Sequence, residues 1–182
     1  TLDKISTLFD TKNHPEVTSI DSYSFDKNEK QILIAANTNS IFRRSFTADY
    51  FVYDIASKKV SRFTSNAIQE PAFSADGTKI SYVFENNLYV YDQISAASIQ
   101  ITQDGKKNHI INGITDWVYE EEFAFVKAYD WNSAGNKIAY IKFDETEVPE
   151  FSMDMYNQGL YPTQEVFKYP KAGEKNAIVS LY

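Results

Sequence analysis

The sequence contains no cysteine and only two histidines, His14 and His109. A disulfide framework and a thiolate metal site are therefore excluded, and two distant histidines cannot form a His-rich zinc site within this chain. No apolar run approaches the roughly 18 residues that a membrane-spanning helix needs. Lys and Arg number 18 against 25 Asp and Glu, and the net charge of −7 argues against general binding to nucleic acid.

Several motifs of known chemistry are also missing. The sequence has no P-loop, no G-x-G-x-x-G fingerprint and no G-x-S-x-G nucleophile elbow, so we expect neither a metal nor another cofactor. It also has no N-x-[ST] acceptor for N-glycosylation.

The two ends of the chain indicate a piece of a longer protein. The sequence begins with Thr1 rather than Met, and no basic segment followed by an apolar run is present. The last residues, 178–182, resemble a strand that no turn closes. We therefore expect further parts of the protein beyond these 182 residues.

Aromatic residues are abundant, with 13 Tyr and 13 Phe, and flat rings of this kind favour β-strands. One pattern occurs three times: an aromatic residue, a polar turn, and an Ile seven positions after the aromatic. The three pairs are Phe25 and Ile32, Phe73 and Ile80, and Trp131 and Ile138. Asp76-Gly77 in the second copy favours a tight hairpin turn, because Gly adopts positive φ easily. Each copy therefore predicts two strands joined by a turn, with the aromatic packed between sheets.

The first two copies continue alike, since residues 50–54 match 88–92 and residues 62–64 match 100–102. Four strands per unit are typical of a β-propeller blade. An antiparallel sandwich or meander is the alternative, but such folds do not repeat their sequence at a nearly fixed period. We therefore predict an all-β fold, part of a β-propeller with four-stranded antiparallel blades.

The spacing of the three copies is uneven, with 48 positions from Phe25 to Phe73 and 58 from Phe73 to Trp131. About ten extra residues lie around 37–49, and about twenty lie between 103 and 127. Without them, each spacing would be about 38 residues. Insertions in repeats map to loops, and loops on a rigid scaffold often carry function, so we expect the functional site in these two insertions.

The first insertion places Arg43 and Arg44 between Phe42 and Phe46. A guanidinium is a planar group with several donors, suited to carbonyl or carboxylate oxygens. Two arginines among aromatics in an acidic protein could therefore form a recognition element. The alternative is that both arginines are simply solvated on a loop.

The second insertion contains Asp116 followed by Trp117-Val118-Tyr119 and three glutamates, 120–122. Asp116 is a good N-cap, so we predict a short helix that carries the glutamates. Three adjacent carboxylates repel one another, and a primary ammonium with three donors suits two of them. The spacing does not decide which two of the three carboxylates would bind the ammonium. The alternative is that the glutamates form a solvated acidic face of the helix. A glycosidase carboxylate pair fits poorly, because its two carboxyls flank a bond and usually come from different elements.

The segment Asp116–Glu122, D-W-V-Y-E-E-E, resembles the signature of the dipeptidyl peptidase IV family, serine exopeptidases of the prolyl oligopeptidase type. The similarity extends to Phe42–Thr47, to Thr146–Pro149, and to Tyr169–Gly173, which reads Y-P-K-A-G. The resemblance implies an eight-bladed propeller capped by an α/β-hydrolase domain. Residues 1–182 would then be about three blades and part of a fourth of the N-terminal propeller, and the hydrolase domain would lie outside this chain.

The resemblance also implies roles for three residues. Glu121 and Glu122 would bind the free α-ammonium of a peptide substrate, and Arg43 would hold the carbonyl of its second residue. The parent would be a serine-type dipeptidyl aminopeptidase that releases X-Pro or X-Ala dipeptides. Its catalytic Ser, Asp and His would lie in the hydrolase domain, so this chain alone would be inactive. The alternative is a non-catalytic propeller scaffold whose parent has lost the serine nucleophile.

Partners and location follow from the same resemblance. We expect peptide substrates with a free N-terminus, contact with the hydrolase domain of the same chain, and a homodimer of the full-length protein. Secreted animal members use disulfides and N-glycans, neither of which this sequence supports. We therefore expect a bacterial parent that is exported to the periplasm or the cell surface.

Overall fold

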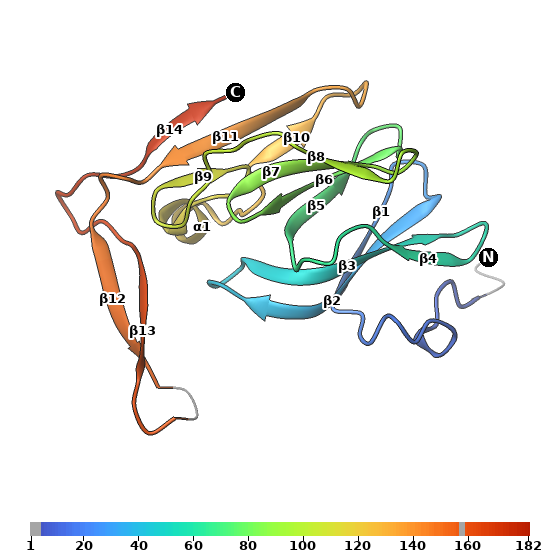
Figure 1. The fold of residues 1–182 in the computed structure, drawn as a ribbon, viewed down its shortest axis with the longest axis horizontal. Helices are drawn as coiled ribbons and strands as arrows, with labels where there is room; N and C mark the ends of the chain where they lie inside the picture. The colour runs from blue at the N-terminus through green and yellow to red at the C-terminus, as the bar shows by residue number, and fades with distance from the viewer. Residues whose placement is uncertain (1–4, 157–158) are drawn as a thin grey trace.

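The computed structural model describes residues 5–156 and 159–182, and its elements are mostly β-strands (Figure 1). In these residues the helical elements are the 3-10 helix η1 (Thr11–Asn13) and the α-helix α1 (Trp117–Phe123). None of the described helices is long and apolar enough to cross a membrane. The all-β class predicted from the sequence is confirmed.

Two sheets contain four antiparallel strands each, in chain order. The first is formed by β1 (Ser22–Phe25), β2 (Gln31–Ser40), β3 (Phe46–Asp54) and β4 (Lys59–Arg62), and the second by β5 (Gln69–Phe73), β6 (Lys79–Phe84), β7 (Asn87–Asp92) and β8 (Ala97–Gln100). Gly77 has a φ of +73° in the turn between β5 and β6, as the Asp-Gly pair predicted. The two repeat units of the sequence are therefore two four-stranded blades.

The third sheet departs from this simple order. Its strands are β9 (Ile110–Asn112), β10 (Tyr129–Trp131), β11 (Ile138–Asp144) and β14 (Ile178–Leu181). β10 and β9 pair with successive parts of β11 along one edge, and β14 pairs with the other edge. The chain between β9 and β10 leaves this edge and returns to it, and α1 lies in that excursion.

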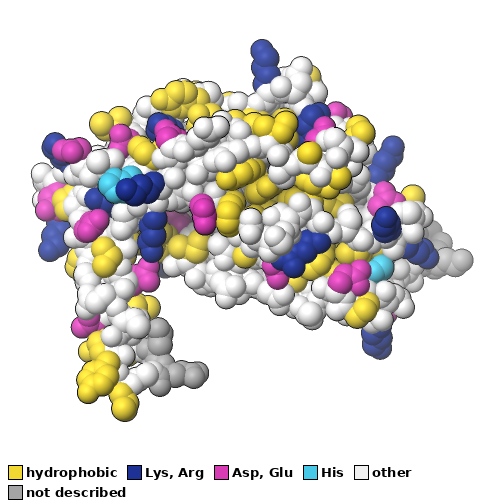
Figure 2. All heavy atoms as spheres, viewed as in Figure 1, with side chains coloured by type: hydrophobic (Ala, Val, Ile, Leu, Met, Phe, Trp, Pro, Cys, Tyr) yellow, Lys and Arg dark blue, Asp and Glu magenta, His cyan; other side chains and the backbone are white. Residues whose placement is uncertain are grey.

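A two-stranded hairpin, β12 (Glu150–Met155) and β13 (Thr163–Lys168), separates β11 from β14 along the chain. It pairs with none of the three sheets and projects away from them (Figure 1). Its free part exposes large apolar side chains (Figure 2). These are Met153, Met155, Tyr156, Leu160 and Tyr161.

The cores lie between neighbouring sheets. Tyr82 of the second sheet packs with Tyr50 of the first, and Val83 and Leu88 pack with Phe143 of the third. The indole of Trp131 also donates a 2.8 Å hydrogen bond to the Ser81 hydroxyl, which joins the third sheet to the second.

Two of the three repeat aromatics occupy the predicted position. Phe73 packs on a cluster that includes Leu33 of the first sheet and Ile80 of the second, and Trp131 contacts the second sheet. The prediction was wrong for Phe25, which is 43% exposed and packs against Tyr23 of its own strand. The reason is that Phe73 and Trp131 each contact the sheet that precedes their own in the chain, whereas no sheet precedes the first one among the described residues.

Candidate ammonium-binding site

The first insertion is a longer hairpin rather than a loop. β2 and β3 continue past the length of their counterparts β6 and β7, with a bulge between Ala36 and Asn39. Only residues 41–45 form the turn at the tip, where Ile41 N–H donates to the Ser45 carbonyl at 2.8 Å. Thr47 and Phe46 pair with β2, as expected of residues with high strand propensity. Arg43 therefore stands at the end of a paired two-stranded arm, which positions it better than a free loop would.

The second insertion is closed at its base by main-chain hydrogen bonds. Thr115 N–H donates to Val126 and Ala128 N–H to Gly113, at 3.0 and 2.9 Å. Gly113 has a φ of +79°, and a Cβ there would lie 3.2 Å from Val83, so glycine suits both the backbone and the space. The excursion is thus fixed to the sheet at its neck.

The helix α1 in this excursion is short but capped at both ends. The Asp116 carboxylate accepts a 2.9 Å hydrogen bond from Tyr119 N–H, which confirms the predicted N-cap. Ala124 ends the helix in the left-handed region, with φ +60°. Tyr119 packs edge-on against Phe143 of the core, and Trp117 lies 4.6 Å from the Tyr169 ring between centroids. These contacts fix the orientation of a helix too short to be stable alone.

The three glutamates of α1 have different environments. Glu120 is only 1% exposed, and its Oε1 accepts hydrogen bonds from the backbone N–H groups of Arg44 (2.6 Å) and Ser45 (2.9 Å). Glu121 is partly buried and Glu122 is exposed. The first carboxylate of the acidic run, Glu120, thus faces the hairpin tip, whereas Glu121 and Glu122 remain accessible.

Arg43 forms an ion pair with Glu121, which lies 78 positions later in the sequence. Its Nε lies 2.8 Å from Oε2 and 3.2 Å from Oε1 of Glu121. The Arg43 side chain is 70% exposed and that of Glu121 is 16% exposed, so the pair lies at the surface with Glu121 on its protected side. The Arg44 side chain forms no ion pair among the described residues. The structure therefore brings together Arg43 and Glu121, and it distinguishes Arg43 from Arg44.

Glu122 lies beside the Y-P-K-A-G segment. A shallow pocket of about 310 Å³ is lined by Glu122, Trp117, Tyr169 and Lys171, among others. Glu122 forms no hydrogen bond or ion pair within the described part of the chain. Its carboxylate is therefore available to a ligand, and two sequence segments that are 50 residues apart border the same space.

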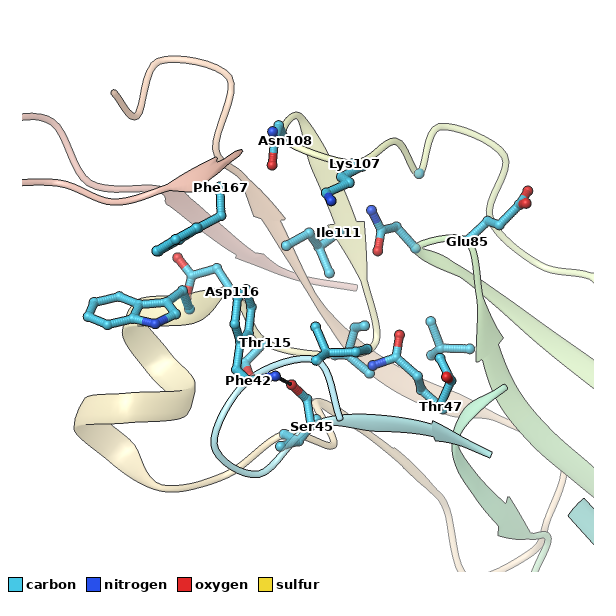
Figure 3. A pocket seen from close by; sticks show the side chains of 18 of the residues that line it. Phe42, Ser45, Thr47, Glu85, Lys107, Asn108, Ile111, Thr115, Asp116 and Phe167 are labelled. Atoms are coloured by element: carbon cyan, nitrogen blue, oxygen red, sulfur yellow. Dashed lines mark hydrogen bonds between the residues drawn. The ribbon is translucent and has the colours of Figure 1, made fainter. Parts of the chain in front are cut away.

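A larger cavity of about 700 Å³ opens at the N-terminal end of α1 (Figure 3). Phe42, Asp116 and Phe167 surround it, and the buried Glu145 and the partly buried Lys168 also line it. Burial, and next the charge of Asp116, raise the pKa of Glu145 to about 7. Burial also raises the pKa of Asp116, and the Tyr119 N–H partly opposes this. A pair of buried carboxyls is thus held close to the start of the helix.

Sequence reasoning missed two residues of this region. Glu145 follows β11 directly, and no motif or spacing marks it as buried near Asp116. The partners of Glu120, two backbone amides of the hairpin tip, were also not predicted from the sequence. In residues 5–156 and 159–182, no cluster of three or more His, Cys, Asp or Glu is arranged to hold a metal ion.

Comparison with known proteins agrees with these features. The sequence profile of the "Dipeptidyl peptidase IV (DPP IV) N-terminal region" matches residues 26–182. Dipeptidyl peptidase 4 of Bos taurus is 36% identical over 183 residues, which cover 97% of this chain and 23% of the relative. Inactive dipeptidyl peptidase 10 of Mus musculus is 34% identical over 166 residues, covering 88% and 21%.

A solved structure shows the same likeness in three dimensions. The crystal structure of Porphyromonas gingivalis dipeptidyl peptidase 4 matches with a TM-score of 0.85 and 37% identity, over 90% of this chain and 24% of that one. The chain thus spans only about a fifth to a quarter of the length of these relatives. Its four-stranded antiparallel sheets match the propeller of that structure, and none of the sheets in residues 5–156 and 159–182 closes on itself. With its repeated blades, its glutamate helix and these matches, the chain belongs to the dipeptidyl peptidase IV family, as part of the N-terminal region.

Proposed function

We propose that this chain supplies the substrate-anchoring part of a dipeptidyl aminopeptidase, in which Glu121 and Glu122 bind the free α-ammonium of a peptide. The observation that carries the proposal is the set of contacts around α1. One glutamate, Glu120, is used internally, and the next is paired with Arg43 at the surface. Glu122, the last, is exposed beside a pocket. Two accessible carboxylates on adjacent residues match the three donors of an ammonium group.

Arg43 would complete the site. Its Nε is engaged by Glu121, which leaves the two terminal nitrogens of the guanidinium for a substrate. A peptide carbonyl is an acceptor for such donors, and the carbonyl of the second residue lies close to the bound amino end. Arg43 would therefore bind that carbonyl and also hold Glu121 in position.

Such a site would explain the release of dipeptides, because it would fix the distance between the amino end of the substrate and the scissile bond. An ammonium fixed on the propeller places the scissile bond two residues away, over a nucleophile on another domain. Binding energy at the remote charge thus positions the reacting bond. We place the catalytic Ser, Asp and His in an α/β-hydrolase domain outside this chain, with X-Pro or X-Ala dipeptides as products. The chain alone would then have no peptidase activity.

The proposal is tested in the full-length protein with a chromogenic X-Pro substrate. Glu121→Ala and Glu122→Ala should each reduce kcat/KM strongly, because each removes a charged acceptor of the ammonium. Glu85→Ala is a matched control, since Glu85 lies in the turn between β6 and β7, outside the proposed site. Wild-type values of kcat/KM in both site variants would refute the assignment.

A non-catalytic scaffold is the second candidate function. It is favoured by one relative, whose name describes it as an inactive dipeptidyl peptidase, at 34% identity over 88% of this chain. The two functions differ in the part of the protein outside this chain. A G-x-S-x-G nucleophile elbow followed by Asp and His in the full reading frame supports the peptidase, and their absence supports the scaffold.

We also propose that the full-length protein is a homodimer and that the β12–β13 hairpin contributes to its interface. The hairpin projects from the sheets, and Met155 and Tyr156 on it are 38% and 75% exposed (Figure 2). An exposed apolar patch of this kind is typical of an interaction surface. Met155→Asp with Tyr156→Asp should shift the protein from dimer to monomer in analytical ultracentrifugation, and an unchanged dimer would exclude the hairpin.

For location, we propose a bacterial protein that is exported to the periplasm or the cell surface. The chain has no Cys and no N-glycosylation acceptor, which fits a bacterial exported peptidase better than a secreted animal one. Fractionation of cells that express the full-length protein tests this, and recovery in the cytoplasm alone would contradict it.

A further inference from the structure

Glu120 is the most deeply buried carboxylate of the glutamate run. It is 1% exposed, and one oxygen accepts two short hydrogen bonds from the backbone of Arg44 and Ser45. A carboxylate taken out of water is costly unless its charge is met by good donors, and hydrogen bonds to an ionised group are the strongest of these. The donors lie on the tip of the β2–β3 hairpin, some 75 positions earlier in the chain.

These two amides belong to the residues directly after Arg43. The tip closes on itself through Ile41 N–H to the Ser45 carbonyl and Phe42 N–H to the Ser45 hydroxyl, at 2.8 and 3.2 Å. Neither of these hydrogen bonds connects the hairpin tip to α1. The Arg43–Glu121 ion pair does so, but it is exposed, and exposed pairs contribute little to holding two segments together. The Glu120 bonds are therefore the main polar link between the hairpin tip and the helix.

We propose that Glu120 is a positioning residue: its buried carboxylate fixes the backbone next to Arg43 onto α1, so that Arg43, Glu121 and Glu122 form one preorganised site. This inference rests on the function proposed above and assigns a distinct task to the first glutamate of the run. Glu120 does not touch substrate. It sets the distance between the guanidinium, which comes from the first sheet, and the carboxylates, which come from the third.

The neighbours of Glu120 indicate how its variants should behave. Burial, and to a smaller extent the Glu120 charge, raise the pKa of Glu70, while Lys127 opposes this. Glu120 therefore shares its surroundings with another carboxyl and a cation. Glu120→Gln keeps an oxygen that can accept both backbone N–H groups. Glu120→Ala removes the acceptor and leaves two amides without a partner, so the hairpin tip is released from the helix.

The kinetic test uses the full-length protein and an X-Pro chromogenic substrate with a free amine. Glu120→Ala should lower kcat/KM roughly 10- to 100-fold, and Glu120→Gln should recover most of the loss. The double variant Glu120→Ala/Arg43→Ala should be nearly as active as Arg43→Ala alone, because residues that act through one another are not additive. If Glu120 only stabilised the fold, the losses of kcat/KM in the two single variants would instead multiply in the double variant.

Asp26→Ala is the matched control. The Asp26 carboxylate is also buried, at 5% exposure, and accepts two short backbone hydrogen bonds, from Lys30 (2.6 Å) and Gln31 (2.7 Å). These bonds stay within its own turn of the first sheet. Asp26→Ala should therefore lower the unfolding temperature as Glu120→Ala does, but keep the wild-type kcat/KM in the folded protein.

Hydrogen exchange supplies a readout that does not depend on activity. The amides of Arg44 and Ser45 should exchange much faster in Glu120→Ala, and moderately faster in Glu120→Gln, while the paired amides of β3 beyond the tip stay protected. If Glu120→Ala does not fold, Glu120→Gln carries the exchange test. Unchanged exchange at both amides overturns the positioning role.

The outcomes also separate this inference from the proposed function. If Glu121→Ala, Glu122→Ala and Arg43→Ala lose activity but Glu120→Ala does not, the site stands and the positioning role is wrong. Multiplied losses in the double variant lead to the same conclusion. If Glu121→Ala, Glu122→Ala and Arg43→Ala all keep wild-type kcat/KM, the proposed function itself is wrong, and the exchange data alone then decide whether Glu120 holds the tip.

Discussion

Replacing Arg43 by Ala should separate activity from stability. The Arg43 side chain is 70% exposed, and its ion pair with Glu121 lies at the surface. Exposed pairs contribute about 0–1 kcal/mol to the free energy of unfolding. Arg43→Ala should therefore change the unfolding temperature of the full-length protein very little, since the side chain that it removes is largely exposed and leaves no cavity.

The expected effect on catalysis is larger. In the bound complex, substrate shields the guanidinium from water, and a hydrogen bond from a charged donor is then worth about 1.5–3 kcal/mol. This corresponds to a loss of roughly 10- to 150-fold in kcat/KM. Glu121 also loses the partner at 2.8 Å that orients it, which adds to the loss. Arg43→Lys should recover only part of the activity, because an ammonium cannot reproduce the planar set of donors.

Initial rates with Gly-Pro-4-nitroanilide give kcat/KM, and thermal unfolding is measured on the same samples. Arg44→Ala is the matched control, because it removes an adjacent exposed arginine side chain but keeps the backbone N–H that Glu120 accepts. Arg44→Ala should retain the wild-type kcat/KM. The reasoning is refuted if Arg43→Ala does the same, or if both variants lose activity equally.

Two further predictions concern stability. The pKa of Glu145 is about 7 in the folded state against 4.5 for an ordinary Glu, so the folded protein holds this proton more strongly. Its stabilising contribution is complete below pH 4.5 and is lost as the pH rises through 7. Glu145→Gln should therefore raise the unfolding temperature at pH 8 relative to wild type and leave it nearly unchanged at pH 4.5; an equal difference at both pH values would contradict this. Phe143 is fully buried and contacts Tyr119 of α1, so Phe143→Ala should cost about 3–5 kcal/mol in denaturant unfolding, and a loss below about 1 kcal/mol would show that the core does not depend on it.

Much of the fold was predictable because it depends on local patterns that repeat. The aromatic, turn and Ile spacing located the strand pairs of all three sheets, and Asp76-Gly77 located a turn that needs positive φ. Phe25 was the exception. Its position in the repeat is correct, but its burial depends on a neighbouring sheet, which a repeat unit does not encode.

The candidate site was predictable only in part. Asp116 marked the start of the helix, and the family signature selected Arg43, Glu121 and Glu122 from among several charged residues. The partners of Glu120 were beyond sequence reasoning, because they are backbone amides in another sheet and carry no side-chain signal. The same holds for Glu145, whose burial results from the packing of β11 near the start of α1.

The most direct test of the central claim compares substrates with and without a free amine. In the full-length protein, kcat/KM is measured for Gly-Pro-4-nitroanilide and for its N-acetyl derivative, with wild type and Glu122→Gln. We predict that wild type strongly prefers the free amine and that Glu122→Gln loses most of this preference through slower cleavage of the amine substrate. An undiminished preference in both Glu122→Gln and Glu121→Gln would contradict the account, because the ammonium would then be recognised elsewhere.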